Sequence, residues 1–170
     1  LSVSTGAVAI ATLAGSWTAT IGTQNMGTAR ILTNGFNANV SSASTILQGS
    51  QGFTLNNTGG SKAVTLTGSA LTDTLIGGRT GDVLVGGGGS DYFQVTTGTQ
   101  SVSDLANGGL SEVVTVAPGA IATATLSSAW TPNASTVNNG TANVAANGFA
   151  VNLSALNSGN GFNVTNTGAA

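Results

Sequence analysis

The chain has 170 residues; 40% of them are hydrophobic, only 5% are charged, and the net charge is −2. Its three Lys and Arg residues cannot form a basic stripe, so nucleic acid and anionic membrane surfaces are not expected partners. The absence of His and Cys excludes Ser-His-Asp triads, thiolate nucleophiles, zinc cages and disulfides. Polar residues interrupt the apolar ones too often for a membrane span, so we expect no membrane insertion.

The chain opens with a segment that occurs twice. The sequence at positions 3–18, VSTGAVAIATLAGSWT, returns at positions 116–131 as VAPGAIATATLSSAWT, so Val3 corresponds to Val116. The match continues in the same alignment to the Asn-Gly-Phe triplets at 34–36 and 147–149, and then slips because the first copy has four extra residues between about 42 and 52. We therefore predict a β-rich unit at 1–60, a spacer at 61–115 and a second copy at 116–170, within a longer tandem array.

Both copies alternate apolar and polar residues with the period of two that is typical of strands. Examples are Phe36, Ala38 and Val40 in the first copy and Phe149, Val151 and Leu153 in the second. No helical stripe of useful length is present. We predict an all-β protein whose units are small β-sandwiches or β-solenoids. The single Trp of each copy, Trp17 or Trp130, is assigned to the core, with a sugar-stacking platform as the alternative.

The spacer contains three nonapeptides in phase, GSALTDTLI, GGRTGDVLV and GGGGSDYFQ, starting at Gly68. Asp73, Asp82 and Asp91 occupy the same position in successive nonapeptides, and so do the apolar residues Leu75, Leu84 and Phe93. Glycine-rich turns tolerate positive φ angles and close main-chain approach. The pattern therefore indicates repeated tight turns that each carry one carboxylate, either as cation ligands or as solvated Asp side chains in ordinary turns.

This pattern resembles the calcium-binding G-G-x-G-x-D-x-U-x repeat of the RTX (repeats-in-toxin) family. The third nonapeptide matches at every fixed position, and the other two match in part. The resemblance implies a parallel β-roll in which two nonapeptides make one coil and calcium lies between stacked turns. Asp73 and Asp91 would then share one side, whereas Asp82 would lie on the other, stacked on a degenerate turn that carries Gln100. We expect one strong calcium site and at most one weaker site.

The candidate calcium ligands are acidic side chains and the main-chain carbonyls of glycine-rich turns, since calcium takes six to eight oxygen ligands. Asp104 and Glu112 lie in what resembles the closing segment of RTX rolls, as extra ligands or as turn caps. All five acidic residues fall between positions 73 and 112, which favours a ligand role. The full candidate set is Asp73, Asp82, Asp91, Gly77, Gly86, Gly88, Asp104 and Glu112.

The sequence predicts a non-enzymatic structural protein, a calcium-stabilised tandem-repeat subunit of a surface layer, fibre or adhesin stalk. Its low charge favours association with copies of itself. The resemblance implies type I secretion from a Gram-negative bacterium and an extracellular or cell-surface location. The alternative is a carbohydrate- or ice-binding module of a large adhesin or polysaccharide-modifying enzyme, with a glycan partner that contacts Tyr92 or the two Trp residues.

Overall fold

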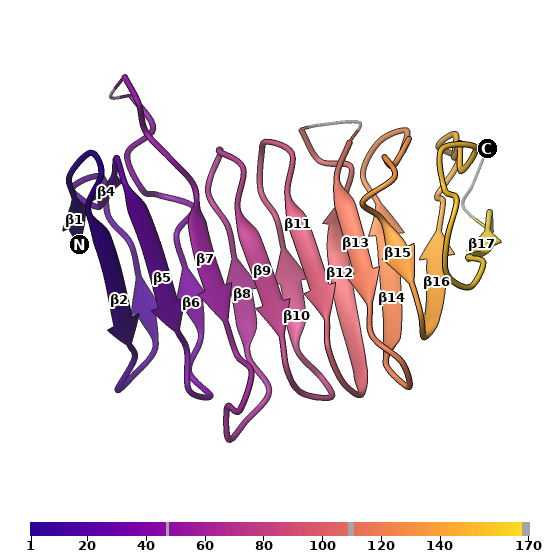
Figure 1. Ribbon diagram of the computed structural model, residues 1–170, viewed down its shortest axis with the longest axis horizontal. Helices are drawn as coiled ribbons and strands as arrows, with labels where there is room; N and C mark the ends of the chain where they lie inside the picture. The colour runs from indigo at the N-terminus through magenta and orange to yellow at the C-terminus, as the bar shows by residue number, and fades with distance from the viewer. Residues whose placement is uncertain (47, 109–110, 168–170) are drawn as a thin grey trace.

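The computed structural model describes residues 1–46, 48–108 and 111–167, and the regular elements in these ranges are β-strands. The strands follow one another along the long axis of the molecule, and the two termini lie at opposite ends (Figure 1). The prediction of an all-β protein is confirmed. The last residues of the predicted second copy, 168–170, lie outside the described residues.

Two large sheets and one small sheet contain all the named strands. A seven-stranded sheet has the order β15-β13-β11-β9-β7-β5-β2, an eight-stranded sheet the order β17-β16-β14-β12-β10-β8-β6-β3, and β1 pairs with β4. The seven-stranded sheet consists of β2 (Val8–Thr12), β5 (Thr28–Leu32), β7 (Phe53–Asn56), β9 (Thr74–Gly77), β11 (Tyr92–Val95), β13 (Val113–Val116) and β15 (Val137–Asn138). The eight-stranded sheet consists of β3 (Trp17–Thr18), β6 (Ala38–Asn39), β8 (Thr65–Thr67), β10 (Val83–Val85), β12 (Thr99–Leu105), β14 (Ile121–Leu126), β16 (Thr141–Ala145) and β17 (Asn163–Thr165), and the small sheet of β1 (Ser2–Val3) and β4 (Gln24–Asn25).

Every pairing between these strands is parallel. Because consecutive strands pass from one sheet to another and each returns beside an earlier strand, the chain winds into a β-solenoid of about eight turns. The solenoid is thus the architecture observed, whereas the alternative of sandwich units is not confirmed. The repeat units and the spacer are parts of one continuous coil.

The spacer has the shortest coils. Thr65 pairs with Val83 and Val83 with Ser101, while Thr74 pairs with Tyr92, so each of these three coils spans two nonapeptides. The coil from Tyr92 to Val113, at the end of the spacer, is longer. The in-phase apolar residues all lie in the core, where Leu75, Leu84 and Phe93 are 0% exposed. The predicted coil length and the inward direction of the apolar residues are confirmed.

The flanking copies have longer coils with a third side. Val8 of β2 pairs with Thr28 of β5, and Thr115 of β13 pairs with Val137 of β15, so both coils exceed two nonapeptides in length. The first two coils have three strands each, β1 to β3 and β4 to β6, which belong to three different sheets. The extra residues of the first copy fall between β6 and β7, and the described part of this connection projects from the solenoid (Figure 1).

The sequence repeat is also a structural repeat. Gly6 and Gly119 have φ angles of 74° and 77°, and the Asn25 and Asn138 side chains donate to the carbonyls of Gly52 and Gly161. However, β2, β5 and β7 belong to the seven-stranded sheet, whereas their counterparts β14, β16 and β17 belong to the eight-stranded sheet. The second copy is therefore displaced both along the solenoid and around it.

Gly140 is expected to tolerate no side chain, because a Cβ atom there would lie 2.3 Å from the Ala120 carbonyl oxygen and 2.5 Å from that of Ala117. Gly140→Ala should lower the free energy of unfolding by about 1–3 kcal/mol, measured by urea denaturation. Gly15→Ala is the matched control, since nothing lies within 4 Å of a Cβ atom at that position. Equal urea midpoints for the two variants would contradict the close packing at Gly140.

Candidate metal centre

Four of the five acidic residues gather along one edge of the solenoid. Asp73, Asp91 and Glu112 each precede a strand of the seven-stranded sheet, namely β9, β11 and β13. The register of Tyr92 with Thr74 and with Val113 places these three residues in consecutive positions of one ladder. Asp104 comes from the end of β12, and it accepts hydrogen bonds from Gly86 N at 2.8 Å and Gly87 N at 2.9 Å. We call these four residues the acidic edge.

The acidic edge caps main-chain N–H groups of the turns between the sheets. Asp73 accepts from the Phe53 and Ser69 N–H groups, both at 2.5 Å, and from Ser69 Oγ at 2.8 Å. Asp91 Oδ1 accepts from Asp73 N at 2.8 Å, and Glu112 Oε2 from Ala106 N at 2.5 Å. The turn-capping role expected as one alternative for Asp104 and Glu112 is therefore present. Their role as ligands stays a prediction.

Among the described residues, two carboxylate oxygens of the acidic edge have no hydrogen-bond partner. Asp91 Oδ2 and Glu112 Oε1 are buried and accept no hydrogen bond. A buried polar atom without a partner costs on the order of 1–3 kcal/mol, and more when it carries charge. A bound cation would give these oxygens a partner, so the residues of this edge fit a cation-binding site.

Burial raises the pKa values of Asp73, Asp91 and Glu112, and repulsion between carboxylates adds to the rise at Asp91 and Glu112. The pKa of Glu112 rises to about 8, mainly through burial and further through the charges of Asp91 and Asp104. The pKa of Asp91 rises to about 7, mainly through burial and also through Asp73 and Asp104, while the pKa of Asp73 is raised by burial. Without a cation, the folded chain thus binds protons at this edge that the unfolded chain releases.

In chelator, the chain should lose stability as the pH rises from about 5 to about 8, because each raised pKa favours the folded state at low pH and this advantage disappears above the folded-state value. The loss should be on the order of several kcal/mol, measured as urea midpoints across that pH range. Glu112→Gln should flatten the dependence. A stability that rises over the same pH range in chelator would contradict this account.

Asp82 lies on the opposite edge and has a complete set of partners. Its oxygens accept from the main-chain N–H groups of Val64, Gly78 and Arg79 and from the Asn57 amide at 3.0 and 3.2 Å. Ser101 pairs with Val83 of β10, so Gln100 stacks on Asp82 as the sequence predicts. Yet Gln100 is packed against Gly77, where a Cβ atom would lie 1.8 Å from its Oε1. The predicted weaker site thus has one carboxylate, whose oxygens are both satisfied, and its buried oxygen without a hydrogen-bond partner is the neutral Gln100 Oε1.

The glycine candidates divide between the two edges. Gly86 lies beside Asp91, since a Cβ atom at Gly86 would be 2.3 Å from Asp91 Oδ2. Gly88 belongs to the same turn, and its N–H donates to the Ser69 carbonyl. Gly77 lies on the edge of Asp82, where its carbonyl accepts from Thr96. The glycines therefore allow the close approach of Asp91 at Gly86 but do not form one common cluster.

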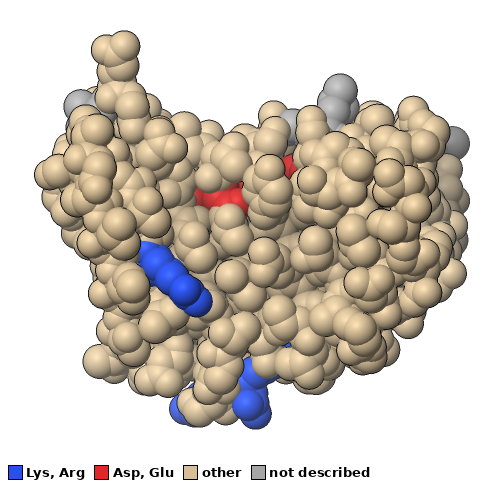
Figure 2. All heavy atoms as spheres, in the orientation of Figure 1, with Lys and Arg blue, Asp and Glu red and all other residues tan. Residues whose placement is uncertain are grey.

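The acidic side chains lie inside the solenoid, whereas the basic side chains lie on its surface. Asp73, Asp82, Asp91 and Glu112 are 0% exposed and Asp104 is 9% exposed, whereas all three Lys and Arg side chains are exposed. In Figure 2 the acidic atoms lie inside a hollow and the basic side chains project from the surface. This burial excludes the alternative in which the turn Asp residues are simply solvated. A buried position does not by itself identify a ligand.

Two polar contacts around the carboxylates lie outside the predicted set. Ser69 donates to Asp73 from the second position of its nonapeptide, and Asn57 donates to Asp82 from the first copy, well upstream of the repeats. Ser69 could have been read from the repeat frame, but nothing in the sequence links Asn57 to Asp82. Within the described residues, no group of three or more His, Cys, Asp or Glu side chains could hold a metal ion. Any calcium site here therefore needs main-chain oxygens as well as carboxylates.

The two Trp residues differ in position. Trp130 is fully buried, donates from Nε1 to the Glu112 carbonyl at 3.1 Å, and packs edge-to-face on Phe162 at 5.8 Å. It is a core residue, as predicted, and cannot stack on a sugar in this fold. Trp17 is half-buried, while Tyr92 is 42% exposed.

Comparisons with protein-family models, curated proteins and solved structures give no match to this chain. The described part of the chain forms no helix with the length and apolarity needed to cross a membrane. The resemblance of the nonapeptides to RTX repeats therefore stays a prediction from the sequence.

Proposed function

We propose that this chain is a non-enzymatic structural protein, a solenoid segment of an extracellular array that calcium stabilises. The observation that carries the proposal is the acidic edge, where four buried carboxylates lie together and two of their oxygens have no partner. In the described ranges their hydrogen-bond donors are main-chain N–H groups and Ser69 Oγ, and no Lys or Arg side chain is among them. A cation would complete both the charge balance and the coordination.

Asp73 and Asp91 are the proposed calcium ligands between the turns that precede β9 and β11. Glu112 and Asp104 would supply further oxygens to the next turn of the same edge. Calcium is the cation of choice because carboxylate and carbonyl oxygens are its preferred ligands and irregular loops accommodate its coordination. When bound, it would supply positive charge where the folded chain otherwise holds repelling carboxylates.

A structural role follows from what these carboxylates do. Asp73, Asp91 and Asp104 accept main-chain hydrogen bonds from the preceding coil, and Glu112 accepts one from Ala106 within its own coil, so a ligand at this edge would act on the stability of the solenoid. Calcium that binds only the folded state adds its binding free energy to that of folding. Folding would then follow the calcium concentration, which is high outside cells, and this supports an extracellular location.

Asp91→Asn should separate the destabilisation caused by repulsion within the acidic edge from the role of Asp91 as a calcium ligand. The variant keeps a carbonyl oxygen for the Asp73 N–H group but removes one of the repelling charges. At pH 8 we expect it to melt higher than the natural chain in chelator and to lose most of the rise in melting temperature that calcium gives the natural chain.

Asp82→Asn is the matched control, since Asp82 lies on the opposite edge, and it should keep the calcium response. Calorimetry with calcium and with magnesium provides the readout. An undiminished calcium response in Asp91→Asn, or no response in the natural chain, would rule out the acidic edge as a calcium site.

Self-association should accompany calcium-dependent folding. Calcium titrated into the chelated chain should increase the β signal in circular dichroism and the scattered light together, because the nearly uncharged surface does little to keep copies apart. A calcium-saturated chain that stays monomeric at high concentration would contradict the assembly part of the proposal while leaving calcium binding intact.

A further inference from the structure

The first coils of the two copies have similar sequences but different burial. In the second copy, the inward-facing residues of this coil are at most 4% exposed, whereas their counterparts in the first copy are half-buried. The pairs are Ala122 and Ala9, Ala124 and Ala11, Leu126 and Leu13, and Trp130 and Trp17. The same face is thus covered in one copy and open in the other.

The second copy shows what covers this face. Strand β12 pairs with β14 so that Leu105 lies opposite Leu126, and β11 pairs with β13. After β12, the Ala106 carbonyl accepts from Ser128 Oγ, and the Glu112 carbonyl accepts from Trp130 Nε1 at 3.1 Å. One preceding coil, paired in parallel, therefore covers this face of the second copy, and it does so with apolar side chains and main-chain carbonyls.

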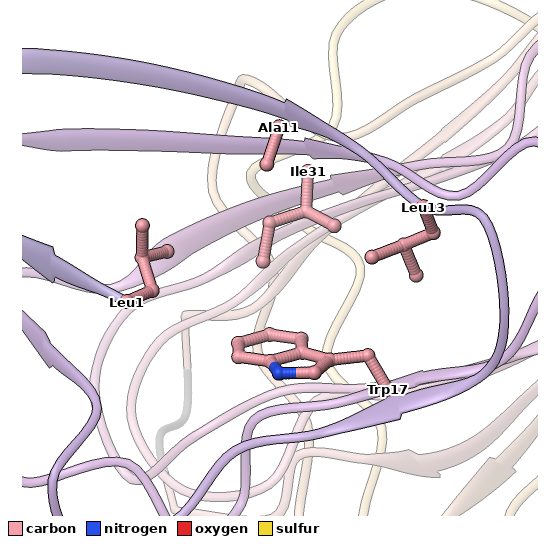
Figure 3. Close-up of a pocket in the computed structure, with 5 residues that line it drawn as sticks. All are labelled: Leu1, Ala11, Leu13, Trp17 and Ile31. Atoms are coloured by element: carbon pink, nitrogen blue, oxygen red, sulfur yellow. The ribbon is translucent and has the colours of Figure 1, made fainter.

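In the first copy the corresponding face contains an open apolar cavity of about 170 Å³. Its lining side chains converge from β2, β3, β5 and the residues directly before β1 and after β2, as Figure 3 shows for Leu1, Ala11, Leu13, Trp17 and Ile31. Strand β2 is the last strand of its sheet, so the main-chain groups on its free side have no strand partner among the described residues. Unpaired main-chain groups and apolar side chains thus occur together, as an added strand requires.

We propose that this face of the first copy is a docking surface for one more solenoid coil, built like residues 92–113 and joined to the first copy as those residues are joined to the second. The coil would pair with β2 in parallel, fill the cavity beside Trp17 and bring a carbonyl to Trp17 Nε1. The inference goes beyond the proposed function, because the contacts that cover the second copy are strand pairing and hydrogen bonds to the main-chain carbonyls of Ala106 and Glu112.

The test joins a second copy of the sequence at positions 92–113 directly to Leu1, which corresponds to Val114 when the two copies are aligned. Acrylamide quenching in a Trp130→Phe background reports on Trp17, and hydrogen exchange of residues 8–12 in the natural background gives a second readout that does not depend on that substitution. We expect quenching of Trp17 to fall severalfold and β2 to gain protection under every condition in which circular dichroism shows the unextended chain to be folded.

Two controls make the result specific. A shuffled extension of the same composition should protect neither Trp17 nor β2. Ala11→Lys should leave the unextended chain folded, because Ala11 lines the open cavity, but should abolish the protection in the extended chain. The proposal would be overturned if Trp17 were quenched, and β2 exchanged its amide hydrogens, as fast in the extended chain as in the chain with the shuffled extension. A second result would also overturn the proposal. If the unextended chain formed end-to-end oligomers that protect Trp17 as well as the extension does, and if the extension did not displace them, the occupant of this face would be the C-terminal end of a second copy.

Discussion

Parallel main-chain pairing between successive coils determines every other feature of this protein. Once a residue has its partner in the next coil, the turns at the ends of the strands are stacked as well, with whatever side chains they carry. In the spacer the pairing distance is twice the nonapeptide length, so each second turn falls on the same edge. That distance stacks Asp91 on Asp73, and the next, longer coil, from Tyr92 to Val113, places Glu112 beside Asp91 in the same ladder.

The cost of this arrangement is electrostatic. Three carboxylates follow one another in a ladder with adjacent strands, and a fourth approaches from β12, in positions that exclude solvent. Their main-chain hydrogen bonds offset part of the desolvation, but the repulsion between them remains, and two oxygens accept nothing. Asp82 shows the contrasting solution on the other edge, where Asn57 and main-chain N–H groups satisfy both oxygens of a single charge.

The sequence predicts the parts of this structure that are periodic. The all-β class and the burial of Leu75, Leu84 and Phe93 follow from spacing, because a repeated residue must occupy a repeated position, and the coil of two nonapeptides follows from the resemblance of that spacing to a known repeat. The choice between sandwich and solenoid units was not predictable, since both bury alternate residues of short strands. Contacts such as that of Asn57 with Asp82 join a longer coil to a shorter one, so no constant spacing marks them.

The change of sheet between the two copies has a geometric consequence for any longer assembly of this type. The ladder that forms the small sheet in the first copy continues as part of the seven-stranded sheet in the second, and the ladder of β2 and β5 moves to the eight-stranded sheet. Each repeat therefore advances by one side of a three-sided coil. In a chain that continued the pattern, a side chain carried by every repeat would follow a helical path around the fibre axis. Consecutive repeats would present that side chain on different sides of the fibre, so repeats that present it on the same side would not be neighbours.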